Sequence, residues 1–215
     1  MRELSMESVE LLVKTIADVA LANTEYFSEL DSAAGDADFG VSLATGFQAV
    51  LDRWDTLDRV SVGAFLTKVG MVIISTVGGC SGPIWGTGFM RAGMSAKGKR
   101  ALTLPDLVTM LRSAMDGIMA RGGAQLGDKT LLDALAPATQ ALEEWSRHDT
   151  QDIVAALEAA ASGATGAIEL TRDWVAKRGR QSFLGERSRG TLDPGIVAVA
   201  TMMQAGAAAL KRRDT

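Results

Sequence analysis

The sequence contains one cysteine and one histidine in 215 residues. A single cysteine, Cys80, excludes an internal disulfide framework and a cysteine-based zinc site, and it is typical of a protein from a reducing compartment. The single histidine, His148, lies in a short polar stretch between two expected helices, where a surface position is expected. We therefore do not expect acid–base or phospho-carrier chemistry through histidine in this chain.

Basic runs and uninterrupted apolar runs are also missing. The formal net charge is −4 and the only basic cluster is the KRR near the C-terminus, so the electrostatic footprint of a nucleic-acid partner is absent. The longest uncharged stretch, residues 69–90, contains Pro83 and several glycines, which argues against a membrane span. The first residues, MRELSMESVELLVK, carry acids and lack the continuous apolar core of a signal peptide. We expect a cytoplasmic protein.

Apolar residues recur at spacings of three and four along most of the chain, which is the pattern of amphipathic helices. The stretch KVGMVIISTVGG is rich enough in β-branched residues for a buried strand, but its length and its helical surroundings favour a helix. No repeat or linker divides the chain, so residues 1–215 are expected to form one domain. The predicted fold is all-α, an eight-helix antiparallel up-and-down bundle or barrel, with helices at roughly 5–29, 38–54, 61–77, 82–97, 104–121, 129–146, 150–178 and 194–212.

The connections between these expected helices are of two kinds. Those after the second, fourth and sixth helices are short and polar, whereas glycine and charge concentrate after the first, third, fifth and seventh. These four read LDSAAGDADFG, GGCSGP, RGGAQLGDKT and GRQSFLGERSRGTLDPG. In an up-and-down bundle all four emerge at the same end. Because glycine lets a ligand approach the backbone closely, this end is the expected functional site, and His148 belongs to the opposite end.

The first of these connections holds three aspartates, Asp31, Asp36 and Asp38. Three neighbouring carboxylates repel one another unless a cation lies among them. Oxygen ligands suit Mg²⁺, which characteristically bridges protein carboxylates to the phosphates of a substrate. An EF-hand is a poor match, because Gly40 and Phe47 fall where calcium ligands belong. The alternative is that Asp38 caps the next helix, Asp36 lies in a turn and Asp31 is solvated.

The second connection has the makings of an anion site. Its backbone N–H groups, from Gly78 to Ser81, precede a helix N-terminus, where the helix dipole favours negative charge. A plain Gly-Gly helix cap is the alternative. Cys80 has no histidine nearby in the sequence to activate it, so we expect a packed residue and not a nucleophile. Neither a Walker P-loop nor a Rossmann fingerprint is present, so a nucleotide would bind in another way.

The third and fourth connections add further charged residues. Those that can counter phosphate charge as planar multi-donor groups are Arg180, Arg187 and Arg189. Asp128 and Asp193 are each good helix caps, and Lys129 is expected to be a solvated lysine in a first helical turn.

Four stretches, GDADFG, GGCSGP, GDKTLLDAL and GERSRGTLDPG, resemble in the same order the signature loops of the L subunit, the nucleotide-binding subunit, of dihydroxyacetone kinases. The resemblance covers nearly the whole chain. It implies an eight-helix antiparallel barrel that binds ADP or ATP at one end through two Mg²⁺ ions held by three aspartates. It also implies a partner, a separate K subunit, which holds a short ketose covalently on its own histidine while the L subunit presents the phosphoryl group.

The resemblance also implies roles by motif position. Asp31, Asp36 and Asp38 match the metal ligands, and together with Arg180 they are the implied catalytic residues. The positions that resemble nucleotide contacts are Phe39, Gly40, Val41, Ser42, Cys80, Ser81, Gly122, Leu131, Arg180, Asp193, Pro194 and Gly195.

Two residues of the first connection depart from the family pattern. The family usually reads G-D-G-D-H-G in the first loop, whereas this sequence has Ala37 for the second glycine and Phe39 for the histidine. A phenyl ring cannot donate to a phosphate, so either a neighbour such as Ser42 substitutes or the partner or substrate differs. The expected substrate is dihydroxyacetone or a related short ketose such as a tetrulose.

Two other functions stay open at this point. One is a phosphotransferase-system version, in which ADP remains bound as a cofactor and is rephosphorylated by a phospho-histidine carrier protein. The other is a nucleotide-sensing regulatory or interaction subunit without transfer activity, which the altered first loop allows.

Overall fold

The structure, a computed structural model, describes residues 1–32, 36–148 and 152–214. Its helices are α1 (Met6–Ala22), α2 (Thr24–Ser32), α3 (Phe39–Asp52), α4 (Val62–Thr76), α5 (Ser81–Ser95), α6 (Leu104–Gly122), α7 (Leu132–Ser146), α8 (Ile153–Arg172) and α9 (Pro194–Asp214). Two 3₁₀ segments, η1 (Trp54–Thr56) and η2 (Arg180–Ser188), and an antiparallel pair of two-residue strands, β1 (Leu4–Ser5) and β2 (Ala101–Leu102), complete the described elements.

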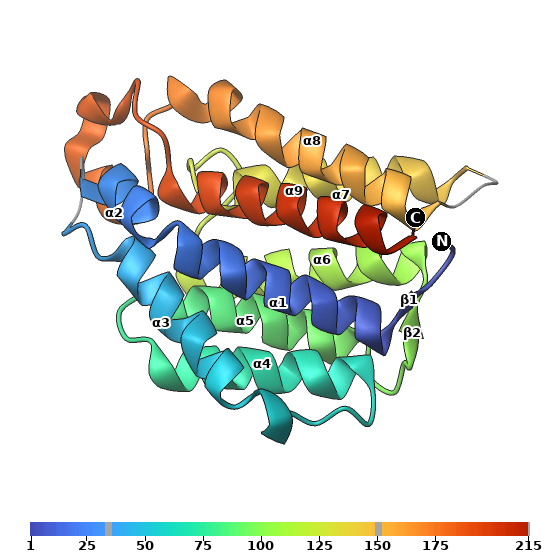
Figure 1. The fold of residues 1–215 in the computed structure, drawn as a ribbon. Helices are drawn as coiled ribbons and strands as arrows, with labels where there is room; N and C mark the ends of the chain where they lie inside the picture. Colours follow the sequence, from blue (N-terminus) through green and yellow to red (C-terminus); the bar gives the residue numbers. More distant parts are fainter. Residues whose placement is uncertain (33–35, 149–151, 215) are drawn as a thin grey trace.

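The long helices form a closed ring. From α3 to α9 each packs against the next along the chain, and α1 closes the ring between α9 and α3 (Figure 1). The apolar faces meet inside this ring, where Phe47, Phe65, Leu142 and Ile196 are fully buried. The predicted all-α class and bundle architecture are confirmed, and the ambiguous β-branched stretch is helical, as favoured.

Helix α8 has the length and apolar composition that would allow a helix to cross a membrane, and it is the one such helix in the described part of the chain. In this fold it packs between α7 and α9 as one wall of the ring. The buried helix of a globular core passes the same compositional test, so this feature carries little weight.

Two expected helices end earlier than their apolar patterns suggest. The first breaks at Asn23, whose side-chain Nδ2 donates to the carbonyl of Val19 at 2.8 Å, while the hydroxyl of Thr24 donates to the carbonyl of Leu21 at 2.9 Å. These polar side chains compete for backbone groups, so the chain turns and α2 begins anew. The seventh ends at Arg172 and not at residue 178. The residues after it belong to a long connection that shapes the site.

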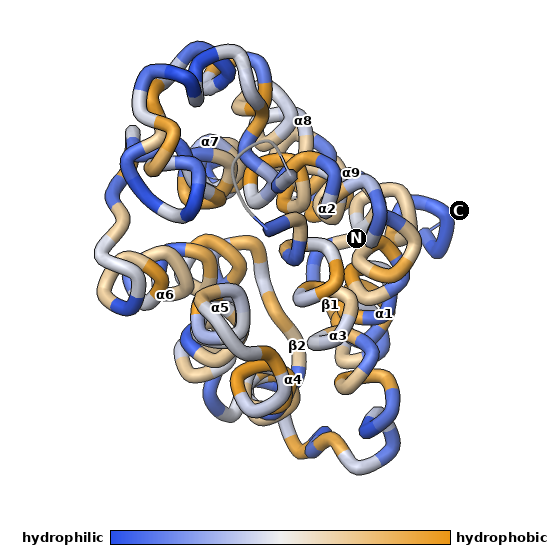
Figure 2. Tube along the Cα trace, turned by 90° about the vertical axis from the view of Figure 1, so that its left-hand side faces the viewer, coloured by the Kyte–Doolittle hydropathy of each residue, from blue (hydrophilic) through white to orange (hydrophobic). Residues whose placement is uncertain are grey.

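The two ends of the ring differ in character. The termini and the β1–β2 pair lie at one end, at the right of Figure 1, and the long connection that contains η2 lies at the other together with α2 (Figure 1). Figure 2 looks onto this second end. His148 follows α7, is exposed and packs near the ring of Trp145, in keeping with its expected surface position.

Candidate functional site

A cavity of about 210 Å³ opens at the η2 end of the ring, and residues from all four glycine-rich connections line it. The expected convergence of alternate connections therefore holds in the structure. Of the residues singled out from the sequence, those in its wall are Asp31, Asp38, Phe39, Cys80, Ser81, Gly122, Leu131, Arg180, Asp193, Pro194 and Gly195.

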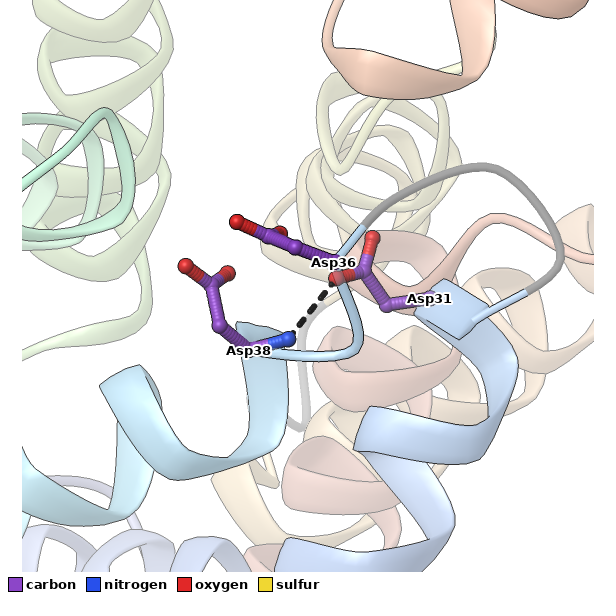
Figure 3. Close-up of side chains that lie close together, drawn as sticks. All are labelled: Asp31, Asp36 and Asp38. Carbon is purple, nitrogen blue, oxygen red and sulfur yellow. Dashed lines mark hydrogen bonds between the residues drawn. The ribbon is translucent and has the colours of Figure 1, made fainter.

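The three aspartates of the first connection come together at the mouth of this cavity. One oxygen atom of each carboxylate lies within 4.8 Å of the others. Asp31 is buried at the end of α2, and its Oδ2 accepts a hydrogen bond from the backbone N–H of Asp38 at 3.2 Å (Figure 3). The same oxygen accepts from the N–H of Phe39 at 3.4 Å. Asp38 makes no side-chain cap bond to α3. The alternative of a solvated Asp31 and a capping Asp38 therefore does not describe this site.

A single guanidinium faces the three carboxylates. Arg180 Nη2 lies 2.8 Å from Asp36 Oδ2 and 3.9 Å from Asp38 Oδ2. Burial raises the pKa of Asp38, and the charges of Asp36 and Asp31 raise it further while Arg180 opposes them. One positive charge among three carboxylates leaves the group negative. An all-oxygen donor set of this charge and spacing fits a hard divalent cation such as Mg²⁺.

The second connection places the N-terminus of α5 beside the aspartates. Gly78 and Gly79 are exposed, Gly79 has a φ of 65°, and α5 begins at Ser81. A side chain at Gly82 would put its Cβ 2.1 Å from the carbonyl oxygen of Val77, so this turn requires glycine. The N–H groups of a first helical turn have no intrahelical partners and attract anions, and Cys80 and Ser81, at the start of α5, line the cavity wall. Cys80 is exposed, so the expectation of a packed residue is wrong.

Three of the implied nucleotide contacts do not line the cavity. Gly40 is buried against α2, where a Cβ would lie 2.0 Å from the carbonyl of Thr24, and Val41 is exposed. Ser42 lines a crevice next to the cavity together with Ser81. In this structure Gly40 acts at the α2–α3 contact, where it sets the distance between the helices that carry the aspartates.

The opposite wall is built by the start of α9 and the residue before α7. Asp193 caps α9, because its Oδ1 accepts from the N–H of Ile196 at 2.8 Å, and burial raises the pKa of this carboxyl to about 7. A Cβ at Gly195 would lie 3.1 Å from Asp193 Oδ1 and 3.3 Å from Leu131 Cβ. The absence of a side chain at Gly195 keeps this wall open.

Arg178 and Gln181 are among the cavity residues that the sequence did not single out. Arg178 lines the cavity, with Nε 3.7 Å from Asp128 Oδ2. Gln181 is buried and lines it as well; its Nε2 donates to the carbonyl of Leu192 at 2.7 Å, and its Oε1 has no hydrogen-bond partner among the described residues. Arg178 is an arginine two positions before Arg180, so residue type could have pointed to it. Gln181 gave no such signal.

Arg187 and Arg189, by contrast, do not line the cavity. The guanidinium of Arg189 bonds to Glu186 and to the carbonyl of Asp173. The expectation that they counter charge at the site is therefore not supported by their positions. Both follow Gly185, whose non-helical backbone (φ 56°) interrupts η2.

Two expectations for the third connection are wrong. Lys129 is fully buried and not solvated, and it has a φ of 62°, so it cannot lie in a first helical turn. Asp128 accepts from the N–H of Gln125 and does not cap α7. Asp133, in the first turn of α7, accepts from the N–H groups of Gly127 at 2.7 Å and Thr130 at 2.8 Å, so it ties the third connection to the helix without capping it.

Comparison with known proteins places the chain in a family. The family model described as the DAK2 domain matches residues 33–208. The chain belongs to this family, and its relatives of similar length include L subunits of dihydroxyacetone kinases.

Among its relatives, it is 40% identical to the ADP-binding subunit DhaL of the PEP-dependent dihydroxyacetone kinase of Escherichia coli, over 90% of this chain and 92% of that protein. It is 35% identical to the L-erythrulose 1-kinase of Mycolicibacterium smegmatis, covering 92% of this chain but 34% of that one. The crystal structure of the dihydroxyacetone kinase from C. freundii in complex with AMP-PNP and Mg²⁺ superposes with a TM-score of 0.68 at 25% identity, over 94% of this chain and 33% of that chain.

Proposed function

We propose that this chain is the nucleotide-binding subunit of a dihydroxyacetone-type ketose kinase, acting in the cytoplasm as a single domain. It holds a magnesium-bound nucleotide whose phosphoryl group passes to a short ketose on a separate K subunit. The observation that carries the proposal is the convergence of four connections on one cavity, with three carboxylates, a helix N-terminus and Arg180 around it.

Each part of the site suits one part of a nucleotide polyphosphate. Asp31, Asp36 and Asp38 would hold two Mg²⁺ ions, which when bound would draw charge from the phosphate oxygens. The first-turn N–H groups of α5 would donate to the phosphates and hold them in line. Arg180, which pairs with Asp36 here, has the planar fork that binds phosphate oxygens. Leu131 and Asp193 to Gly195 form the wall that would receive the nucleoside.

Two phosphoryl donors are considered: a phospho-histidine carrier protein and free ATP. E. coli DhaL, which matches this chain over nearly its full length, is an ADP-binding subunit of a PEP-dependent kinase, whereas the chain matches about a third of the L-erythrulose 1-kinase. The higher identity to E. coli DhaL favours the first donor. ADP would then stay bound as a cofactor and be rephosphorylated by a phospho-histidine carrier protein.

Reconstitution tests this proposal and the choice of donor. The purified chain is mixed with ADP, Mg²⁺ and a K subunit, with dihydroxyacetone or erythrulose as acceptor, and is supplied with either free ATP or a phosphorylated carrier protein. We expect ketose phosphate with the carrier, and none when the Asp36→Ala variant replaces the chain. Turnover with ATP alone would reverse the choice of donor. Tight binding of nucleotide without phosphorylation of any ketose would replace the kinase role by a regulatory one.

A further inference from the structure

The long connection between α8 and α9 is closed at its base by a buried lysine that comes from a different part of the chain. Lys129 is fully buried, and its Nζ donates to three backbone carbonyls: Arg172 at 2.9 Å, Trp174 at 3.1 Å and Ser188 at 2.8 Å. An ammonium group has three hydrogens. All three are used, and the ion pairs found among the described residues include none with Lys129.

These three carbonyls lie at the two ends of one loop. Arg172 ends α8, Trp174 follows it, and Ser188 ends η2. The N–H of Gly190 donates to the carbonyl of Arg172 at 3.0 Å, and the buried hydroxyl of Ser188 accepts from the N–H of Ala176 at 2.9 Å. Lys129 therefore closes the base of the loop formed by residues 173–190.

The tip of this loop carries the positive charge of the site. Arg178, Gly179, Arg180 and Gln181 line the cavity, and Arg180 reaches Asp36 at 2.8 Å. The side chain of Arg180 is 50% exposed, so the surrounding side chains alone do not hold it in place. Its position depends on where the loop base is fixed.

Placing an ammonium group at this position is unfavourable in two ways, which indicates a specific use. Burial lowers the pKa of Lys129, although the charges of Asp193 and Asp173 oppose this. Its φ of 62° lies in the left-handed region, which residues with a side chain rarely adopt because their Cβ crowds the backbone. A buried polar group that only filled space would be replaceable by an apolar one without the cost of burying the charge.

We propose that Lys129 is a positioning residue for the nucleotide: its ammonium group fixes the loop of residues 173–190 so that the guanidinium of Arg180 faces the aspartates and the phosphates. This inference rests on the nucleotide-binding role proposed above. It assigns to Lys129 an effect on affinity that is transmitted through Arg180.

A double-mutant cycle on nucleotide affinity tests this coupling. The dissociation constant of Mg-ADP is measured by calorimetry for wild type, Lys129→Met, Arg180→Ala and the double variant. Loss of a well-placed guanidinium–phosphate contact weakens binding roughly tenfold or more. We expect such a loss in Lys129→Met and little further loss when it is added to Arg180→Ala. Lys177→Met, which removes an exposed lysine of the same loop, should bind as wild type does.

A second variant covers the case in which Lys129→Met does not fold. Ser188→Ala removes a different bond at the loop base while leaving the ammonium satisfied, and it should weaken binding in the same Arg180-dependent way. Unchanged affinity in a folded Lys129→Met or Ser188→Ala variant, or losses that add fully to that of Arg180→Ala, would overturn the inference.

Limited proteolysis separates this inference from the proposed function, because it needs no nucleotide. Trypsin should cut after Arg178 and Arg180 faster in Lys129→Met than in wild type or Lys177→Met, with the helices left intact. Failure of wild type to bind Mg-ADP would refute the nucleotide role, whereas equal cleavage rates would refute the role of Lys129 in holding the loop.

Discussion

Neutralising one aspartate of the cluster should have opposite effects on the free and the ligand-bound protein. Asp38→Asn keeps the shape of the side chain but removes one of three charges that lie within 4.8 Å of one another. At that separation two carboxylates repel by about 1 kcal/mol in bulk water and by about 3.5 kcal/mol at an effective dielectric constant of about 20. Because the Asp36 and Asp38 side chains are 46% and 53% exposed, the lower value applies.

The free protein should therefore be as stable as wild type or more stable by up to about 1 kcal/mol. Arg180 lies 3.9 Å from Asp38, and the attraction lost with the charge, about 1 kcal/mol in bulk water, offsets only one of the two repulsions that Asp31 and Asp36 exert. The raised pKa of Asp38 supports the same expectation, because it means that the charged carboxylate is disfavoured in the folded state.

With ligand the outcome reverses. A ligand at about a hundred times its dissociation constant stabilises the folded protein by about 2.7 kcal/mol, which for a chain of this size raises Tm by roughly 5–10 °C. Wild type should show this shift with ADP and Mg²⁺ together, and Asp38→Asn should lose most of it. The assay is differential scanning calorimetry with and without ADP and Mg²⁺. Asp55→Asn, which neutralises an exposed acid in η1, serves as the charge-matched control. An Asp38→Asn variant that keeps the full Mg²⁺-dependent shift would refute the metal assignment.

Three further predictions concern the departures from the family pattern and the acid that caps α9. Ala37 has a φ of 57°, a left-handed conformation that glycine adopts without strain. Ala37→Gly should therefore raise the free energy of unfolding, measured in urea, by about 1 kcal/mol. A loss of stability would show that the turn is not strained. Phe39→His restores a hydrogen-bond donor in the cavity wall but loses the edge contact with Phe27. Calorimetry should show Mg-ADP binding roughly 2- to 12-fold tighter, which is the value of one hydrogen bond. Unchanged or weaker binding would mean that another group already donates to the phosphate. Burial raises the folded-state pKa of Asp193 from 3.8 to about 7. Between these pH values the folded protein binds more protons than the unfolded chain, so its stability falls as pH rises from about 4 to 7. This fall should amount to at most about 4 kcal/mol, since the side chain is only partly buried. In Asp193→Asn the stability should no longer fall over this pH range. An unchanged pH profile in that variant would show that Asp193 is not the group with the raised pKa.

The periodic apolar pattern was sufficient to predict the ring of helices and the end at which the four glycine-rich connections converge. Helices of this kind bury one face, and alternate connections of an antiparallel bundle necessarily emerge together. The pattern did not reveal the break at Asn23, because the apolar spacing continues across it while the competing bonds come from Asn23 and Thr24 themselves. Local side-chain bonds of this type are not periodic and are visible only in three dimensions.

Within the site, the residues that the sequence located are those whose chemistry is evident from type and spacing, such as the aspartates. Lys129 was misjudged because lysines are rarely buried, and the three carbonyls that satisfy it belong to residues 43 to 59 positions away in the chain. Gln181 gave no signal, since a buried amide has the same appearance in a sequence as an exposed one. The sequence did not reveal which distant residues would form hydrogen bonds to buried polar groups.

The most direct test of the central claim is a crystal structure of the chain grown with ADP and Mg²⁺. The account predicts metal ions bound by oxygens of Asp31, Asp36 and Asp38 at about 2.1 Å, the phosphates against the first turn of α5, and the nucleoside beside Leu131 and Gly195. ADP bound elsewhere, or bound in the cavity with no metal on these carboxylates, would contradict it.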